Sequence, residues 1–78
     1  MTINKQLGAR IRYLRQQKGF SIEDLALEAD INRNYLGDLE RGMRNPTLII
    51  LNKIAKALDI DLTTLFEGIK ESRASHPN

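Results

Sequence analysis

Four consecutive polar side chains, Asn32, Arg33, Asn34 and Tyr35, are well supplied with hydrogen-bonding groups in this chain of 78 residues. An arginine guanidinium can donate two parallel hydrogen bonds to guanine O6 and N7, and an asparagine amide can pair with adenine N6 and N7. A tyrosine offers a ring face to a thymine methyl group and a hydroxyl to a base or phosphate. Asp38 lies one helical turn beyond Asn34 and could accept from cytosine N4. This pattern predicts base contacts by Arg33, Asn34, Tyr35 and Asp38, with Arg33 as the strongest candidate.

Each of these side chains also has an alternative role. Arg33 could contact a phosphate or stay solvated, and Asn34 could bind a phosphate. Tyr35 could pack against a neighbouring helix. An acid beside DNA, such as Asp38, more often orients an arginine than reads a base. The sequence leaves these alternatives open.

Two short amphipathic helices joined by a tight turn are predicted to position these side chains within residues 21–45. Ser21 with Asp24 resembles a capping box, and Asn32 is a strong N-cap residue for the second helix, which Gly42 would end. The two apolar faces and the connection consist of Leu25, Ala26 and Ala29, then Ile31, then Leu36 and Leu39. This layout is typical of a helix-turn-helix, whose second helix lies in the DNA major groove.

Three further helices are predicted around this pair, and strand signals are nearly absent. The helical spacing of Leu7, Ile11 and Leu14, with Gly19 as a stop, predicts a helix before Ser21. Thr47 can cap a fourth helix and Asp61 a fifth. Their apolar residues are Leu48, Leu51, Ile54, Ala55 and Leu58, and then Leu62, Leu65, Phe66 and Ile69. We therefore expect a compact, all-α, five-helix domain over residues 1–71 and a disordered polar tail over residues 72–78.

The fourth predicted helix is more apolar than a one-sided surface helix requires. Ile49 and Ile50 fall outside the stripe of its other apolar residues. A helix that is apolar on more than one side must be buried on more than one side. A second subunit could supply that burial, although these isoleucines could also complete a tight monomer core. The predicted homodimer interface comprises Ile49, Ile50, Leu62, Phe66 and Ile69.

Composition disfavours several other classes of protein. The chain has no cysteine, so it has no disulfide framework and no thiolate metal site. His76 is the only histidine, and no glycine-rich loop is present, so we expect no enzyme, no cofactor and no metal. The longest apolar run, Leu48 to Leu51, is far shorter than the roughly 20 residues of a membrane helix. We expect a cytoplasmic protein that does not bind a membrane.

Charge is distributed unevenly although the net charge is only +2. Residues 1–20 hold five basic side chains and no acidic one, whereas residues 21–40 hold six acidic side chains and one basic. A nucleic-acid binder needs a basic face rather than a large total charge. The segregation permits such a face but fits ordinary solvated charge equally well.

A longer pattern over about residues 6–66 resembles the phage-repressor-like Cro/C1 (XRE) family. It consists of Ile11-Arg12-x-x-Arg15, Gly19, Ser21-x-x-x-Leu25-Ala26, Glu40-Arg41-Gly42, Asn45-Pro46-Thr47 and Ala55-x-x-Leu58. The opening of the second helix and the Arg44-Asn45 turn look most similar to small controller proteins of restriction–modification systems. Two positions depart from the family pattern: Ile22 stands where glutamine is frequent, and Asp30 where glycine is usual.

The resemblance implies a lambda-repressor-like fold in which Arg15 and Glu40 bridge the first helix to the third. It also implies a sequence-specific transcriptional regulator, acting as a homodimer on an inverted repeat of double-stranded DNA. RNA polymerase is a further possible partner. The alternative is a protein-interaction module or antitoxin whose last two helices bind a partner. The operator, the target genes and the sign of regulation stay open. The predicted phosphate contacts are Arg12, Lys18, Ser21, Asn32, Arg41, Arg44 (which could instead reach the minor groove) and Thr47.

Overall fold

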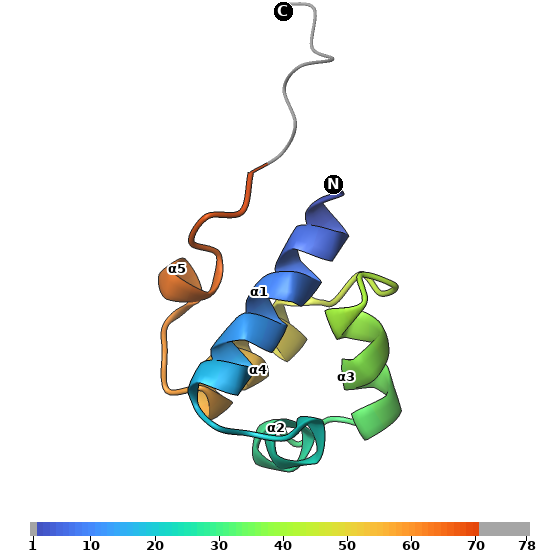
Figure 1. Cartoon of the computed structure of the whole chain (residues 1–78), viewed down its shortest axis with the longest axis vertical. Coiled ribbons are helices and arrows are strands. Elements are labelled where there is room, and N and C mark those ends of the chain that lie inside the picture. Colours follow the sequence, from blue (N-terminus) through green and yellow to red (C-terminus); the bar gives the residue numbers. More distant parts are fainter. Residues whose placement is uncertain (1, 71–78) are drawn as a thin grey trace, which may run out of the picture.

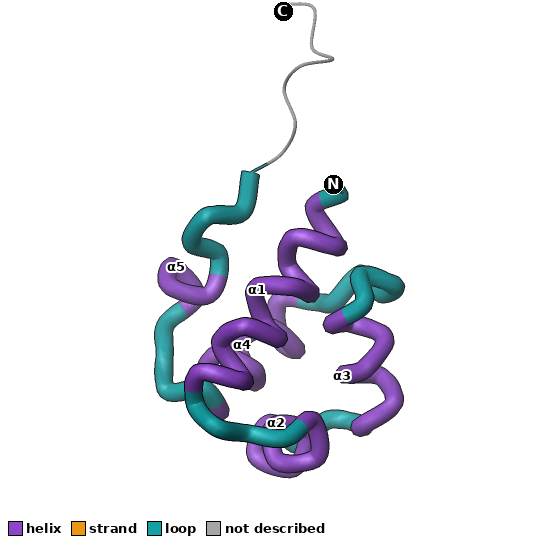
Figure 2. Tube along the Cα trace, viewed as in Figure 1, coloured by secondary structure: helices purple, strands orange, loops and turns teal. Residues whose placement is uncertain are grey.

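The computed structural model describes residues 2–70, which form helices joined by short loops and contain no strand (Figures 1 and 2). The all-α prediction is therefore confirmed over this range. The predicted tail, residues 72–78, and the domain boundary at residue 71 lie outside the described residues. The helices are α1 (Ile3–Gln17), α2 (Ile22–Ala29), α3 (Arg33–Glu40), α4 (Leu48–Ala57) and α5 (Leu62–Leu65).

The helices begin where the predicted caps lie. Ser21 Oγ accepts from the Asp24 N–H at 3.0 Å, and the Ser21 N–H donates to Asp24 Oδ2 at 2.9 Å, which completes a capping box. Asn32 Oδ1, Thr47 Oγ1 and Asp61 Oδ1 each accept from the backbone N–H three residues on, at 3.0, 3.1 and 2.8 Å. Local side-chain chemistry therefore sets the starts of α2 to α5.

The first four helices end in one common geometry. A residue with positive φ follows each helix, and the next N–H donates to the carbonyl five residues back, as in a Schellman motif. Two of these positions hold aspartate, with φ of 56° at Asp30 and 62° at Asp59, so Asp30 adopts a positive φ at the position where the family usually has glycine. The positive-φ residues are Gly19, Asp30, Gly42 and Asp59.

The core draws on every helix. The largest fully buried side chains are Ile11 from α1, Leu25 from α2, Leu36 and Leu39 from α3, Ile54 from α4 and Leu65 from α5. Burial of these side chains is the main stabilising term available to so small a domain. In Figure 1, α3 lies on one side of α1, and α5 with the segment up to residue 70 lies on the other.

A glycine in α1 allows the close approach of α1 and α3. A Cβ at Gly8 would lie 2.4 Å from Leu39 O and 2.5 Å from Glu40 O, distances that real Cβ atoms do not adopt. These oxygens belong to the backbone at the C-terminal end of α3. The role of Gly8 cannot be predicted from the sequence alone, because only the tertiary packing shows what a side chain at this position would meet.

The last two helices differ from the prediction. Leu48 was assigned to the buried stripe of α4, but it is 65% exposed, beside Ile49 at 71%. Ile50, in contrast, packs against the core. The helix predicted through Ile69 ends at Leu65 after a single turn, and the chain turns again at Gly68, which has a positive φ of 83°.

Side chains of α1 hold this turned segment. Arg10 Nη2 donates to the Thr64 carbonyl at 2.8 Å. Gln6 donates to the Lys70 carbonyl at 2.6 Å and accepts from the Lys70 N–H at 2.9 Å. These bonds satisfy backbone groups that would otherwise need a longer helix or water. Long-range contacts with α1 therefore replace the predicted helical turns after Leu65.

Candidate nucleic-acid interface

The first turn of α3 presents two of the predicted base-contacting residues to solvent. Asn32 uses its amide oxygen to cap the helix, and Arg33 and Asn34 follow it as exposed residues. Tyr35 is half-buried and packs against the core, so the packing alternative weighed for this residue is realised in part. A helix N-terminus carries a partial positive charge and unpaired N–H groups, which suit an electron-rich ligand.

Arg33 is held by an acid on the preceding helix. Arg33 Nε donates to Glu23 Oε2 at 2.7 Å, and the pair joins the first turns of α2 and α3. The hydrogen bond from Arg33 lowers the pKa of the Glu23 carboxyl below its ordinary value. Sequence reasoning missed Glu23, because only the helix-turn-helix geometry brings the two side chains together.

Asp38 orients two arginines at the other end of α3. Asp38 Oδ1 accepts from Arg41 Nη2, and Asp38 Oδ2 accepts from Arg44 Nε and Nη2 at 3.3 and 3.2 Å. The Arg44 guanidinium also lies over the Tyr35 ring, 5.3 Å from its centroid. These contacts match the orienting role that was weighed for Asp38 against cytosine recognition.

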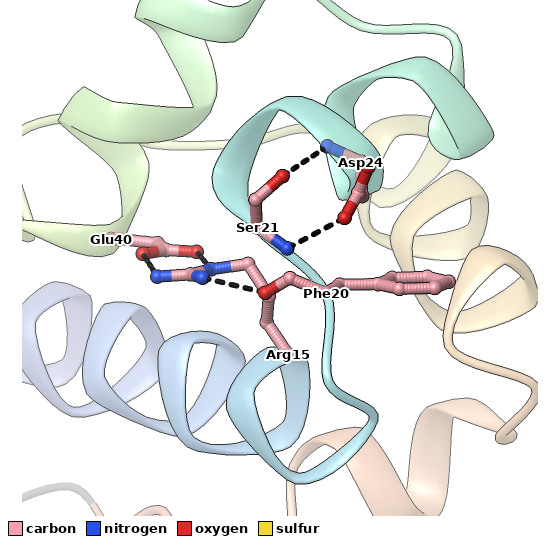
Figure 3. Close-up of polar contacts among 5 residues, drawn as sticks. All are labelled: Arg15, Phe20, Ser21, Asp24 and Glu40. Carbon is pink, nitrogen blue, oxygen red and sulfur yellow. Dashed lines mark hydrogen bonds and ion pairs between the residues drawn. The ribbon is translucent and has the colours of Figure 1, made fainter.

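One guanidinium connects α1, the start of α2 and the end of α3 (Figure 3). Arg15 Nε and Nη2 donate to the two Glu40 carboxylate oxygens at 2.7 and 3.0 Å, and Arg15 Nη1 donates to the Phe20 carbonyl at 2.9 Å. The side chains are only 12% and 6% exposed. The hydrogen bond to Glu40 raises the pKa of Arg15. The predicted bridge is confirmed, and it fixes how α3 is presented.

The profile of the helix-turn-helix family matches residues 11–65, from the middle of α1 to the end of α5. The chain belongs to this family. The match confirms the resemblance stated from the sequence, and its range includes α2 and α3, the two helices that the sequence predicted for the motif.

Two small proteins of similar length resemble this helix-turn-helix protein closely. The control protein C.BamHI of Bacillus amyloliquefaciens is 41% identical over 70 residues, 86% of either chain. The crystal structure of the restriction–modification controller protein C.AhdI from Aeromonas hydrophila superposes with a TM-score of 0.77 at 45% identity, covering 82% of this chain and 96% of that one.

A structure of the controller protein C.Esp1396I, a tetramer in complex with its natural 35 base-pair operator, is also similar, with a TM-score of 0.79 at 31% identity. The match covers 86% of this chain and 88% of that one. Two other curated relatives, both HTH-type transcriptional regulators, are 40% and 42% identical and longer. This chain spans only 41% and 50% of their lengths, about half.

The residues predicted to contact phosphate offer two kinds of donor. The Ser21 and Thr47 hydroxyls and the Asn32 amide accept hydrogen bonds from their own helix N-termini through oxygen, so their O–H and N–H donors can still bind a phosphate. The other predicted residues are exposed cations. Lys18 lies 5.5 Å from the centroid of the Phe20 ring. The cations are Arg12 on α1, Lys18 at the C-cap of α1, and Arg41 and Arg44, which form ion pairs with Asp38.

The predicted dimer residues divide by burial. Ile49 and Phe66 are exposed, at 71% and 38%, whereas Ile50, Leu62 and Ile69 are half-buried against the core.

Within residues 2–70 no helix has the length and apolar character needed to cross a bilayer. The same residues contain no cluster of three or more His, Cys, Asp or Glu side chains able to hold a metal ion.

Proposed function

We propose that this chain is a sequence-specific DNA-binding transcriptional regulator that inserts α3 into the major groove. The observation that carries the proposal is the first turn of α3, where Arg33 and Asn34 are exposed and Glu23 holds the Arg33 guanidinium. In a helix-turn-helix the N-terminal residues of the second helix face the base edges. The relatives named as transcriptional regulators and controller proteins support the same function.

In the proposed complex Arg33 pairs with guanine and Asn34 with adenine. Tyr35 contributes its exposed part to a thymine methyl or a phosphate, and Asp38 aims Arg44 and Arg41 at the DNA backbone. The remaining phosphate contacts come from Arg12, Lys18 and the N-termini of α2, α3 and α4 at Ser21, Asn32 and Thr47.

We further propose that the regulator acts in the cytoplasm as a homodimer on an inverted repeat. Two recognition helices about 34 Å apart would enter successive major grooves on one face of the duplex. The exposed Leu48 and Ile49 offer the apolar surface for self-association. The operator-bound assembly of C.Esp1396I and the small size of C.BamHI and C.AhdI favour a restriction–modification controller protein. Contact with RNA polymerase from an upstream site is then one route to regulation.

Selection from a random duplex library tests this function. The purified protein is incubated with the library, and the bound DNA is recovered, sequenced and aligned. We expect an enriched inverted repeat with half-sites about one helical turn apart. Lys70→Ala, which removes an exposed charge far along the chain from α3, should recover the same repeat. The repeat recovered by Arg33→Ala should be relaxed at one guanine position of each half-site. Recovery of DNA without enrichment of any sequence would mean that binding is driven by charge, and it would refute sequence-specific regulation.

The second candidate function is a protein-interaction module or antitoxin. The exposed apolar residues Leu48 and Ile49 favour it, because a partner protein could cover them as well as a second copy could. A protein that recovers no DNA from the library at low salt would support this function instead.

A further inference from the structure

We call α3 and the residues that follow it through Arg44 the reading surface. Each of its three arginines is paired with a carboxylate in the free protein. Arg33 pairs with Glu23, and Arg41 and Arg44 share Asp38. Residues 21–40, which include α2 and α3, hold six acidic side chains and one basic. A reading surface of this composition attracts phosphates weakly, so its contribution to binding must come from directional contacts.

The Glu23–Arg33 pair is placed to orient the guanidinium and to leave it free for DNA. The contact uses Nε, at 2.7 Å from Glu23 Oε2, and the side chains remain 61% and 54% exposed. The hydrogen bond that the Arg33 guanidinium donates to Glu23 uses Nε, so the terminal amino groups, Nη1 and Nη2, can supply the two parallel donors that guanine O6 and N7 accept.

We propose that Glu23 is a specificity-determining residue: it holds Arg33 in the orientation that reads a base and weakens the attraction of Arg33 for phosphate. The inference rests on the proposed function, because it requires α3 to lie in the major groove. Glu23 acts through Arg33, so it is a positioning residue rather than a base contact.

Electrostatics give the carboxylate opposite effects on the two kinds of contact. A phosphate attracts the guanidinium mainly through net charge, which the adjacent carboxylate offsets. A guanine edge accepts two directed hydrogen bonds, which depend on the plane of the guanidinium, and Glu23 holds that plane. Without Glu23 the Arg33 guanidinium can rotate freely and its charge is no longer offset. It can then bind any phosphate within reach. Specific and non-specific binding should therefore respond differently to its loss.

Glu23→Gln tests the proposal against Glu28→Gln, which makes the same charge change at another exposed position of α2. Binding is measured over a range of salt concentrations to a site obtained by selection with the wild-type protein, and to a scrambled duplex. For Glu23→Gln we expect the ratio of specific to non-specific affinity to fall about fivefold or more, the low end of what a bidentate arginine–guanine contact supplies. Its non-specific salt dependence should steepen by about one phosphate contact.

The control and the double variant separate the outcomes. Glu28→Gln should change both affinities by a similar factor, so its specificity ratio should stay near that of the wild type. In an Arg33→Ala background, Glu23→Gln should leave the ratio unchanged. Equal ratios for the two single variants, or a persistent effect of Glu23→Gln without Arg33, would overturn the role of Glu23. A wild-type protein that selects no site would instead refute the proposed function, and thermal unfolding of each variant checks that the fold is intact.

Discussion

Breaking the Arg15–Glu40 pair should cost a large part of the stability of this domain. Arg15→Met keeps most of the packing volume but leaves the Glu40 carboxylate, whose side chain is only 6% exposed, without a counter-charge. Removing one partner of a buried pair typically costs about 3–5 kcal/mol. A chain of 78 residues is expected to be stable by roughly 4–12 kcal/mol in total. The variant should therefore lose about a quarter or more of its free energy of unfolding.

The double variant Arg15→Met with Glu40→Leu distinguishes the effect of the ion pair on stability from its effect on DNA binding. Replacing a buried ion pair by apolar residues of similar volume is often neutral or stabilising. We expect the double variant to recover most of the loss, to within about 1–2 kcal/mol of the wild type. It should nevertheless bind DNA less well, because the guanidinium no longer joins α1, Phe20 and α3.

Urea denaturation followed by circular dichroism measures these free energies. The control is Glu67→Gln, which removes the partner of Arg10 in an ion pair where the Glu67 side chain is 76% exposed, and it should cost no more than about 1 kcal/mol. The reasoning would be refuted if Arg15→Met cost no more than this control. Losses that simply added in the double variant would refute it equally.

Three further predictions follow from the packing, the caps and the exposed surface. Gly8→Ala should destabilise the fold by about 2 kcal/mol or more, because the new Cβ would lie 2.4 Å from Leu39 O. The control Gly37→Ala places its Cβ 3.5 and 3.6 Å from its nearest neighbours, so it should be neutral or stabilising by up to about 1 kcal/mol. Urea titrations measure both changes. The backbone N–H bond that Asp61 accepts lowers its pKa, so its stabilising contribution is present above the unfolded pKa of about 3.9 and lost as pH falls through the lower folded pKa. Thermal unfolding from pH 7 to 2.5 should show a smaller decline for Asp61→Asn, which keeps the cap without a charge, and an equal decline would contradict this account. Ile49→Lys should change monomer stability by less than about 0.5 kcal/mol yet reduce self-association in sedimentation, whereas a wild-type protein that stays monomeric at micromolar concentration would disprove the homodimer.

Features set by local chemistry could be predicted from the sequence. The capping side chains at Ser21, Asn32, Thr47 and Asp61 bind N–H groups three residues away, so their roles depend on a few neighbours only. The positive φ at Asp30 is also local in origin, because aspartate tolerates the left-handed backbone better than most residues that are not glycine.

Features set by contacts between helices could not be predicted from the residues alone. The length of α5 depends on Gln6 and Arg10, which lie in α1 and bind the backbone of Thr64 and Lys70. The exposure of Leu48 depends on how α4 is rotated against the rest of the core, which apolar spacing alone did not resolve.

The residues of the candidate site also differ in whether local sequence or contacts between helices determine their roles. Arg33 and Asn34 could be chosen from residue type and position, because the first turn of the second helix is where a helix-turn-helix carries its base-reading residues. Glu23 could not, since its role depends on a contact across the turn between α2 and α3. The Arg15–Glu40 bridge was predictable only through the family resemblance, because 25 residues separate the two side chains along the chain.

The central claim is that the first turn of α3 reads bases. Its most direct test is the affinity of the wild-type protein and of Arg33→Ala for every single-base substitution of a selected site. We predict that the wild type loses about 1–3 kcal/mol at a guanine in each half-site and that Arg33→Ala no longer discriminates at that position while keeping its preferences elsewhere. A variant that weakens binding equally to all substituted sites, with every base preference intact, would show that Arg33 contacts phosphate and would contradict the claim.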